Sequence, residues 1–398
     1  MSLSERISHI KPSATLAINA KAQELRKQGV DVISFGVGEP DFDTPRHIRE
    51  AAIQAMEEGF TRYTAVGGID ELKDAVCEKF RKDNNLDYDR SEVMVSCGGK
   101  HVLYNLAQAI LNPGDEVIIP APYWVSYPPI AILAGAEPVV VQTDEANDFK
   151  LSASALEGAI TSRTKLLVLN SPSNPTGSVY TLEELERLAD VMLKHDIYVV
   201  SDDIYEKLIF DGGMFANIAQ AAPGMKKKTF VLNGVSKSYA MTGWRIGYVA
   251  GPSEVIAGMT KIQSQSTSNP NSIAQKAAVA ALCGPQDEIA TMLTAFDERR
   301  KYLVERLNGI NNVSCNTPGG AFYTFPNFSH YFKASFGGKQ IANSAGLAEF
   351  LLTEAKVALV PGIAFGADSF IRFSYATSMA LIKEGVDRIE NALGRLVF

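Results

Sequence analysis

A lysine and an arginine in one segment have the surroundings expected of groups that do chemistry. Lys237 follows the apolar run Thr229–Leu232 and stands among small and hydroxylic residues, with Arg245 further along the same segment. Burial disfavours the ammonium form, so Lys237 is placed to lose its proton and act as a nucleophile that forms a Schiff base. The fixed donors of an arginine suit a phosphate that must be held rigidly. The segment therefore predicts a reactive lysine beside an anion-binding arginine.

Two further stretches could bind anions. Gly98, Gly99 and Lys100 end an apolar run and open a helical pattern, although they do not form a Walker P-loop. Free amides at a helix N-terminus bind phosphate, and glycines let the phosphate come close. Arg372 lies inside an apolar run and needs an anionic partner to be tolerated there. Its donor fork suits the α-carboxylate of an amino acid, and a buried structural ion pair is the alternative.

Two polar loops follow apolar runs. Asn174 lies in the stretch Asn-Ser-Pro-Ser-Asn-Pro-Thr-Gly, where its amide can donate, and ordinary turn chemistry is the alternative. Asp202 and Asp203 end the next run, and Tyr205 follows. Asp202 has the Asp-x-x-Tyr spacing to Tyr205, so we choose it as the functional acid. A solvated acidic turn fits Asp203 better.

The stretch Ser236–Gly247, S-K-S-Y-A-M-T-G-W-R-I-G, resembles the pyridoxal-phosphate lysine segment of fold-type I (class I and II) aminotransferases. It is most similar to the bacterial aspartate aminotransferase branch, which includes enzymes that also act on prephenate. The resemblance runs from Ser4 to about Leu396, with the motifs in family order. It implies pyridoxal 5′-phosphate as cofactor and Lys237, Asp202 and Tyr205 as catalytic residues. In such an enzyme an acid paired with the protonated pyridine nitrogen keeps the ring an electron sink.

The resemblance also implies the contacts of the cofactor and the substrate. The cofactor contacts are Gly98, Gly99, Lys100, Trp124, Asn174, Asp202, Tyr205, Ser236, Lys237, Arg245 and, from the neighbouring subunit of a homodimer, Tyr63. The substrate contacts are Gly38, Trp124, Asn174, Arg372, Lys100 and Thr15. Trp124 would stack on the pyridine ring, and its alternative is a place in the core. Tyr63 could instead be a packing residue.

The resemblance also bears on the distal carboxylate of the substrate and on the hydroxyl group that would bind phosphate. Lys100 and Thr15 match positions that hold the distal carboxylate of aspartate, glutamate or prephenate, and the alternative for Lys100 is to face only phosphate or solvent. Relatives often carry a hydroxyl residue three positions before the lysine, to bind phosphate. Here that position is Gly234, which leaves Ser236 as the nearest hydroxyl.

Composition excludes several classes of protein. The net charge of −7 argues against a nucleic-acid surface. The 4 cysteines and 5 histidines are scattered without the spacing of a metal site. The N-terminal residues lack the apolar core of a signal peptide, and no run is long enough to span a bilayer. We therefore expect a cytoplasmic protein whose partners are amino acids and 2-oxo acids, with no nucleic acid, membrane or metal.

The elements that must position these residues follow an α/β pattern. Short apolar runs separated by helical patterns predict a large domain with a mainly parallel seven-stranded sheet covered by helices. The runs are Val93–Ser96, Glu116–Ile119, Pro138–Gln142, Lys165–Leu169, Ile197–Ser201, Thr229–Leu232 and Ile246–Ala250. Ligands of such sheets sit at the carboxyl ends of the strands, and the candidate residues fall there.

A second, smaller α/β domain is predicted from both ends of the chain. The expected boundaries place 45–285 in the large cofactor-binding domain and 1–44 with 286–398 in the small one. The expected elements of the small domain include a helix over Ala14–Gln28, a strand over Val32–Phe35, and strands over Cys315–Phe325 and Ala358–Val360.

The sequence thus predicts a transaminase that exchanges the amino group of L-aspartate with 2-oxoglutarate, with prephenate as a further acceptor. Two alternatives stay open within the family: a preference for aromatic amino acids or alanine, and a pyridoxal-phosphate-dependent C–S lyase. An aminotransferase-like transcription regulator is a third reading, which the acidic composition disfavours.

Overall fold

The largest sheet has seven strands in the order β2-β8-β7-β6-β5-β3-β4. This computed structural model describes residues 3–10, 12 and 14–398, except for the side chains of residues 14–16 and 19. The strands are β2 (Val93–Ser96), β3 (Glu116–Ala121), β4 (Glu137–Gln142), β5 (Thr164–Asn170), β6 (Tyr198–Asp202), β7 (Thr229–Gly234) and β8 (Gly247–Ala250). Only β8 runs antiparallel to its neighbours, β2 and β7. The predicted fold class and all seven strands are confirmed.

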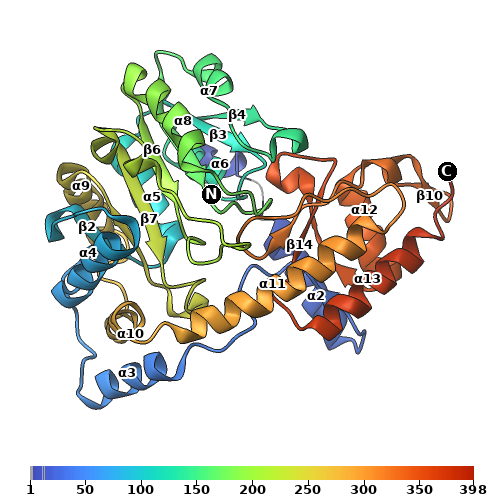
Figure 1. The fold of residues 1–398 in the computed structure, drawn as a ribbon, viewed down its shortest axis with the longest axis horizontal. Coiled ribbons are helices and arrows are strands. Elements are labelled where there is room, and N and C mark those ends of the chain that lie inside the picture. Colours follow the sequence, from blue (N-terminus) through green and yellow to red (C-terminus); the bar gives the residue numbers. More distant parts are fainter. Residues whose placement is uncertain (1–2, 11, 13) are drawn as a thin grey trace.

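Helices cover both faces of this sheet (Figure 1). One face packs against α5 (Gly99–Ile110), α6 (Tyr127–Leu133) and α9 (Ser253–Ser264). The other face packs against α7 (Ala153–Ala159), α8 (Leu182–His195), α4 (Asp70–Asn84) and α10 (Ser272–Cys283). Every residue of β2, β7 and β8 is buried, and most of them are apolar because both faces of these strands are covered. This is why they appear in the sequence as uninterrupted apolar runs.

Helix α8 illustrates how the sequence sets the limits of an element. The side chain of Thr181 accepts a hydrogen bond from the backbone amide of Glu184, and the carboxylate of Glu184 accepts one from the backbone amide of Thr181. This capping box satisfies amides that the first turn leaves free. The buried residues Leu185, Leu188, Ala189, Val191 and Met192 form one apolar face, and Asp196 ends the helix in a left-handed conformation. The face packs on the sheet through the core that includes Leu167 and Val199.

A second group of elements comes from both ends of the chain. Strand β1 (Ile33–Ser34) pairs in parallel with β12 (Val357–Ala358). A three-stranded antiparallel sheet has the order β13-β14-β9, with β13 (Val360–Pro361), β14 (Ile371–Ser374) and β9 (Tyr323–Thr324); a separate pair joins β10 (Ser335–Phe336) to β11 (Lys339–Gln340). The remaining helices are α1 (Glu5–Ser8), α2 (Ala14–Lys27), α3 (Arg46–Glu57), α11 (Asp287–Asn308), α12 (Ser344–Phe350) and α13 (Met379–Leu393).

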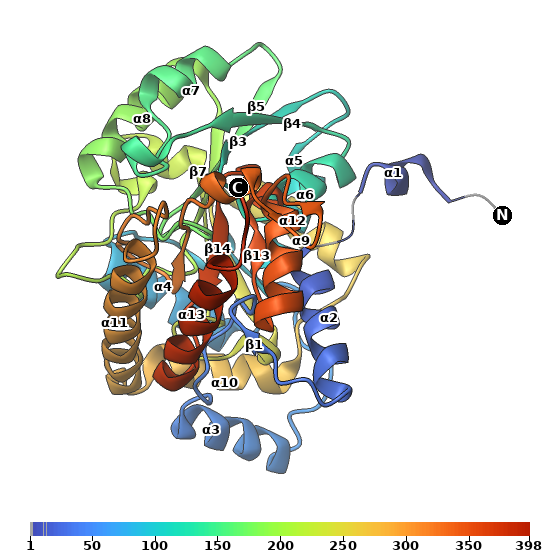
Figure 2. The same ribbon diagram turned by 90° about the vertical axis from the view of Figure 1, so that its right-hand side faces the viewer.

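Most of these elements gather at one end of the molecule, whereas α3 packs against α10 (Figure 1). Figure 1 shows α11 running from beside α10 toward α12 and α13, and Figure 2 shows α2 beside the elements of the C-terminal region. The pairing of β1 with β12 agrees with a unit built from both ends of the chain. The boundaries placed at 44/45 and 285/286 stay a prediction.

The predicted strand over Cys315–Phe325 is wrong for most of its length. Only Tyr323 and Thr324 form a strand, and the residues before them run as an irregular loop. Gly320 lies so close to Pro172 that a Cβ there would be 2.6 Å from the proline ring. The apolar residues of this stretch are buried by packing of the loop, not by a sheet, so the pattern misled the prediction.

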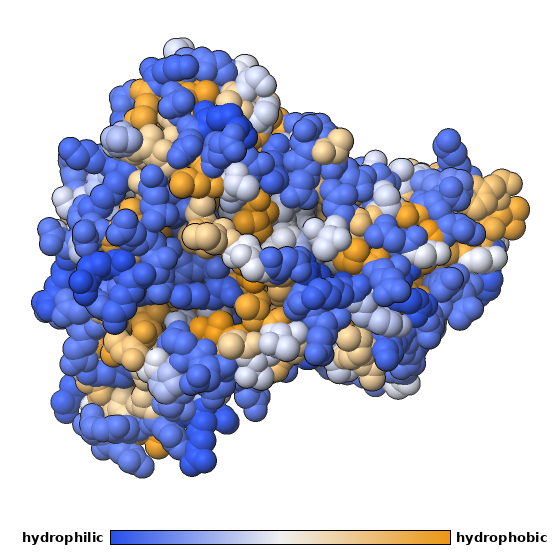
Figure 3. Space-filling view, in the orientation of Figure 1, coloured by the Kyte–Doolittle hydropathy of each residue, from blue (hydrophilic) through white to orange (hydrophobic). Residues whose placement is uncertain are grey.

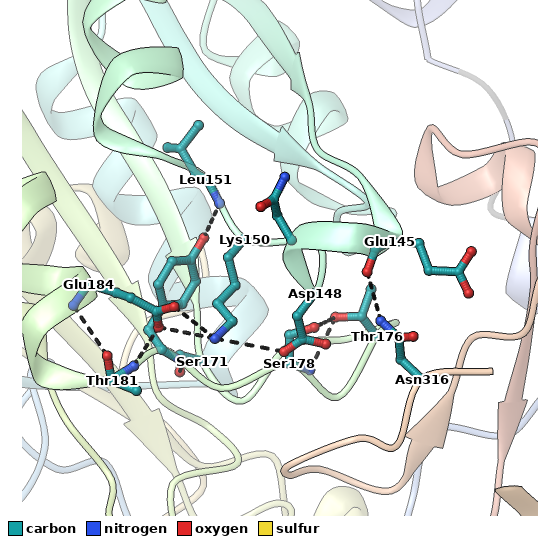
Figure 4. Close-up of polar contacts among 12 residues, drawn as sticks. Glu145, Asp148, Lys150, Leu151, Ser171, Thr176, Ser178, Thr181, Glu184 and Asn316 are labelled. Carbon is teal, nitrogen blue, oxygen red and sulfur yellow. Dashed lines mark hydrogen bonds and ion pairs between the residues drawn. The ribbon is translucent and has the colours of Figure 1, made fainter.

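One short segment ties the two groups of elements together. Glu145, in the turn after β4, accepts a hydrogen bond from Ser314 Oγ at 3.0 Å. Its backbone oxygen accepts a second bond from Asn316 Nδ2 at 2.8 Å (Figure 4). Nearby, the ring of Phe149 packs 5.1 Å from that of Phe370, centroid to centroid. The large sheet is therefore joined to the C-terminal elements by polar and apolar contacts.

The surface and the helices show two further features. The face in Figure 3 is mostly hydrophilic, with apolar residues in separate patches. Among the helices of the described ranges, none combines the length and apolarity needed to cross a bilayer.

Candidate active site

A cavity of about 390 Å³ lies where the carboxyl ends of the central strands meet the C-terminal elements. Its volume is within the range of small-molecule sites. Eleven residues predicted from the sequence line it together: Gly38, Gly99, Lys100, Trp124, Asn174, Asp202, Tyr205, Ser236, Lys237, Arg245 and Arg372. They come from positions between residues 38 and 372, so the fold assembles the site from most of the chain.

One end of the cavity has the features of a phosphate cradle. Helix α5 begins at Gly99, and Gly98 precedes it with φ of +88°. A Cβ on Gly98 would be 2.8 Å from Cζ of Arg245, so only glycine leaves room for the guanidinium there. Arg245 donates to the backbone oxygen of Thr242 at 2.8 Å. A helix N-terminus with an arginine beside it offers donors and positive charge to an anion.

The missing hydroxyl at Gly234 has a steric explanation. A Cβ on Gly234 would lie 3.1 Å from the backbone oxygen of Ile246 and 3.2 Å from Cα of Gly247. Gly247 is in turn close to Gly99, because its own Cβ would be 2.9 Å from Cα of Gly99. The strand ends are packed too tightly for a side chain, and Ser236 supplies the buried hydroxyl of this cavity wall.

Lys237 has the lowered pKa that the sequence predicts. Burial lowers the pKa of its amine to about 8, helped by the positive charges of Arg372 and Arg245 and opposed by Glu39 and Asp202. Its Nζ donates to the backbone oxygen of Gly38. A lysine with this pKa is partly neutral near pH 8 and can serve as nucleophile or base.

Asp202 ends β6 and faces the cavity, buried to 4% exposure. Tyr127 Oη donates to its Oδ2 at 2.7 Å. Burial raises the pKa of Asp202 to about 6, and the bond from Tyr127 holds it lower than burial alone would. Such a carboxylate is ready to pair with a cationic nitrogen.

Asp203 is not the solvated acid that the sequence suggested. It is only 1% exposed, accepts a hydrogen bond from Ser201 Oγ at 2.7 Å and is also bonded by Asn217 Nδ2. Lys79 forms an ion pair with Glu206 close by. Burial raises the pKa of Asp203 well above its usual value. Asp203 points away from the cavity into a polar network that fixes the end of β6.

The loop that carries Asn174 is held from two sides. Asn170 accepts from the amide of Asn174 at 2.8 Å and donates to the backbone oxygen of Asp202 at 2.8 Å. The backbone amide of Tyr180 donates to Ser171 Oγ, and the hydroxyl of Tyr180 accepts from the backbone amide of Leu151. Figure 4 shows Ser171 and Leu151 in this region. These bonds fix the orientation of Asn174 relative to Asp202.

Arg372 is a buried cation without a carboxylate partner among the described residues, and it is 2% exposed. It donates to Asn174 Oδ1 at 2.9 Å and to the backbone oxygen of Gly36 at 2.8 Å. Its Nε has no hydrogen-bond partner in the same described part of the chain. A buried structural ion pair is therefore wrong. Since Arg372 occupies Oδ1 of Asn174, the amide nitrogen of Asn174 is left to donate to a ligand.

Lys100 and Trp124 lie together on the cavity wall. Nζ of Lys100 is 5.1 Å from the centroid of the Trp124 ring. Partial burial and the charge of Arg245 lower the pKa of Lys100. Thr15 is the second residue of α2, but its side chain lies outside the described residues, so its pairing with Lys100 stays a prediction. Tyr63 is 91% exposed and is absent from the cavity lining.

Tyr127 and Tyr323 are among the cavity residues that sequence reasoning missed. Tyr127 begins α6 shortly after Trp124, and an aromatic pair flanking a helix start was the available signal. Tyr323 lies 2.8 Å from Tyr205, hydroxyl to hydroxyl, and its place in Gly-Gly-Ala-Phe-Tyr carried no recognised pattern. Both belong to the cavity as much as the predicted residues do.

The cavity carries more positive than negative charge. Its cationic side chains are Lys100, Lys237, Arg245 and Arg372, and its acids are Asp202 and Glu39. Arg245 beside Gly99 and Arg372 beside Asn174 provide separate anion sites. The arrangement can hold a ligand with a phosphate at one end and a carboxylate at the other, on either side of a reactive amine. Within the described ranges, no cluster of side chains has the composition of a metal site.

Comparison with known proteins identifies close relatives of the whole chain. A model of the class I and II aminotransferase family matches residues 30–389. An aspartate/prephenate aminotransferase of Nitrosomonas europaea is 51% identical over 396 residues, covering 99% of this chain and 100% of the relative. The solved aspartate aminotransferase of Rhizobium meliloti superposes with a TM-score of 0.96 at 46% identity and covers 100% of both chains. That of Thermus thermophilus, solved with maleate, gives 0.93 at 44% identity, covering 98% of this chain and 100% of the other.

Proposed function

The chain belongs to the class I and II aminotransferase family, and we propose that it uses pyridoxal 5′-phosphate to move the amino group of L-aspartate to 2-oxoglutarate. The observation that carries the proposal is Arg372, a buried guanidinium with no carboxylate partner among the described residues, in one cavity with the low-pKa amine of Lys237. Such a cation is tolerated when a ligand supplies the anion. An amino acid brings that anion and the amino group together.

The residues present fit pyridoxal phosphate. The first amides of α5, Arg245 and Ser236 would hold its phosphate, and Asp202 would keep a proton on its ring nitrogen. Asn174 and Tyr205 line the same cavity, and the amide nitrogen of Asn174 and the hydroxyl of Tyr205 would bind its phenolic oxygen. When bound, the cofactor supplies an electron sink for the charge left on the substrate's Cα.

The chain's own groups then perform the proton chemistry. Arg372 binds the α-carboxylate through its fork and fixes the direction of the Cα–H bond. Nζ of Lys237, neutral above about pH 8, takes the proton from Cα. The walls formed by Trp124, Tyr205 and Tyr323 exclude water around that carbon.

The preference for an acidic substrate rests on Lys100. It places a second cation on the cavity wall, where it can meet a distal carboxylate. The names of the relatives support this choice, and the maleate in one solved structure is itself a dicarboxylate. Prephenate, also a dicarboxylate, is proposed as a further acceptor. The relatives do not favour the alternatives with aromatic amino acids or alanine.

The proposal includes a homodimer with shared active sites, in which Tyr63 reaches the cofactor phosphate of the partner subunit. The 91% exposure of Tyr63 leaves its side chain free to contact a neighbouring subunit, as this role requires. The proposed location is the cytoplasm.

A single half-reaction tests the proposed function. The cofactor-loaded protein is mixed with L-aspartate, L-alanine or L-phenylalanine, without an acceptor, while the cofactor absorbance and the released oxo acid are followed. Rapid conversion with aspartate that is lost in Lys100→Ala and kept in Lys194→Ala, an exposed control, is the expected result. Conversion with alanine or phenylalanine alone would refute the acidic substrate. A fourth donor with a Cβ–S bond, L-cystathionine, tests the lyase alternative, because its β-elimination with water releases homocysteine, pyruvate and ammonia. Release of that thiol with no conversion of the cofactor would identify a lyase instead.

A further inference from the structure

Tyr323 occupies a position between the large sheet and the C-terminal elements. It begins β9, is 1% exposed and lines the cavity. In the antiparallel pairing of β9 with β14, Tyr323 lies opposite Ser374. Side chains alternate along a strand, so Arg372 and Ser374 share a face, and Tyr323 is the diagonal neighbour of Arg372 on that face. The register thus places the tyrosine ring beside the guanidinium.

The ring of Tyr323 is a main contact of the buried cation. Cζ of Arg372 lies 4.5 Å from the centroid of the Tyr323 ring and 5.2 Å from that of Phe365. Since Arg372 has no carboxylate partner in the described part of the chain, the aromatic faces and the hydrogen bonds to Asn174 and Gly36 together stabilise its charge before a ligand arrives. They also restrict the guanidinium to one plane, which a bidentate bond to a carboxylate requires.

The hydroxyl of Tyr323 reaches a different partner. Its Oη is 2.8 Å from Oη of Tyr205, a residue of the loop after β6. The backbone at Gly38 packs against the same hydroxyl, since a Cβ there would be 2.9 Å from it. A tyrosine hydroxyl carries one proton, so only one of the two tyrosines can donate across this contact. If Tyr323 donates, the proton of Tyr205 is free to point into the cavity.

We propose that Tyr323 is a positioning residue with two separable roles, both of which rest on the proposed function. Its hydroxyl donates to Tyr205 and directs the proton of Tyr205 toward the phenolic oxygen of the cofactor. Its ring holds the guanidinium of Arg372 in the plane that receives the substrate carboxylate. One side chain thereby aligns the group that tunes the cofactor with the group that binds the substrate.

Two substitutions separate the roles. Tyr323→Phe removes the hydroxyl and keeps the ring, and Tyr323→Leu removes both. Tyr375→Phe is the matched control, because Tyr375 is also fully buried, its hydroxyl donates to a backbone oxygen at 3.2 Å, and it does not line the cavity. Circular dichroism and thermal unfolding establish that each variant is folded, with Tyr323→Met as a second ring-free variant should Tyr323→Leu fail to fold.

Two readouts that need no turnover are measured on the cofactor-loaded proteins. The first is the pH midpoint of the absorbance change of the bound cofactor, and the second is the dissociation constant of maleate. Without the bond from Tyr323, the hydroxyl of Tyr205 is a weaker donor to the phenolic oxygen of the cofactor. More negative charge then stays on that oxygen, and the nitrogen that joins the cofactor to Lys237 becomes more basic. Tyr323→Phe should therefore raise the pH midpoint. We expect a rise of about half a pH unit or more, a change in maleate affinity below about twofold, and no change of either in Tyr375→Phe. The ring-free variants should bind maleate about tenfold more weakly or worse.

The outcomes that overturn the proposal are distinct. A pH midpoint in Tyr323→Phe that matches Tyr375→Phe would remove the role of the hydroxyl. Ring-free variants that bind maleate like the unaltered protein would remove the role of the ring. A protein that binds cofactor and maleate but does not convert aspartate would refute the proposed substrate and leave these measurements valid. A protein that binds no cofactor would overturn both proposals.

Discussion

Replacing Gly98 by alanine should detach the phosphate anchor without touching any charged residue. The new Cβ would stand 2.8 Å from Cζ of Arg245, so the guanidinium must move out of the cradle. Losing one charge-assisted hydrogen bond costs about 1.5–3 kcal/mol, which corresponds to roughly 10- to 150-fold weaker binding of the phosphate. The substitution also strains the backbone, because φ at Gly98 is +88°, at a cost of roughly 1–3 kcal/mol in stability.

A second glycine separates the two effects. Gly114 has φ of +90°, and a Cβ there would meet nothing within 4 Å. Gly114→Ala should therefore lose stability in the same way and leave cofactor binding within about twofold of the unaltered protein, since no charge-assisted bond is disturbed. Urea unfolding of the cofactor-free proteins measures the loss of stability in both variants.

The assay compares pyridoxal phosphate with pyridoxal, which lacks the phosphate, in absorbance titrations of the cofactor-free variants. The affinity for pyridoxal phosphate divided by the affinity for pyridoxal isolates the contribution of the phosphate. This ratio should fall only in Gly98→Ala. An unchanged ratio in Gly98→Ala would show that Arg245 does not hold phosphate in this position. An equal fall in Gly114→Ala would show that backbone strain, not displacement of the arginine, weakens binding.

Three further predictions concern the charged groups of the cavity. The pKa of Asp202 is raised from 3.8 to about 6 because burial disfavours the ionised carboxylate. The folded protein therefore binds this proton more tightly than the unfolded chain does. Above pH 6 the ionised acid destabilises the cofactor-free protein by about 3 kcal/mol. Asp202→Asn should therefore be more stable than the unaltered protein in urea at pH 8, with the difference vanishing as the pH falls from 6 to 4; a difference independent of pH would contradict this. The pKa of Lys237 is lowered to about 8, so the rate at which the cofactor-free protein captures pyridoxal phosphate should rise with pH through about 8 in stopped-flow experiments, and a rise centred near 10 would refute the buried amine. Arg372→Lys should raise the KM for aspartate by roughly 10- to 150-fold, because a lysine cannot replace the two bonds of a planar fork, and a KM within twofold would show that the carboxylate binds elsewhere.

The sequence predicted the sheet well because its strands are buried on both faces. Runs such as Val93–Ser96 and Thr229–Leu232 coincide with β2 and the start of β7. It predicted the cavity residues because parallel strands bring their carboxyl ends to one edge, so motifs at successive strand ends must meet. Asp202 and Asn174, for instance, are linked through Asn170 as this geometry requires.

The features that the sequence did not reveal depend on contacts between distant residues. Asp203 is buried because Asn217 and Ser201 satisfy its carboxylate, and nothing beside it in the sequence indicates those partners. Tyr323 meets Tyr205 across 118 residues of chain. The stretch before Tyr323 is buried without forming a strand, since Gly320 packs against Pro172 and Phe322 packs against Phe296. The local sequence pattern predicts helices and strands, but it does not predict which irregular segments contact one another.

The order of the site residues along the chain has a consequence for synthesis on the ribosome. The groups proposed to face the cofactor, from Gly98 to Arg245, lie within the continuous stretch Val93–Ala250 that contains the whole seven-stranded sheet, whereas Tyr323 and Arg372 come much later. At translation rates of about 5–20 residues per second, the stretch from Arg245 to Arg372 takes roughly 6–25 seconds to make. The nascent chain would therefore expose the proposed cofactor-binding edge well before it can hold a substrate, and the newborn enzyme would acquire its cofactor before its activity.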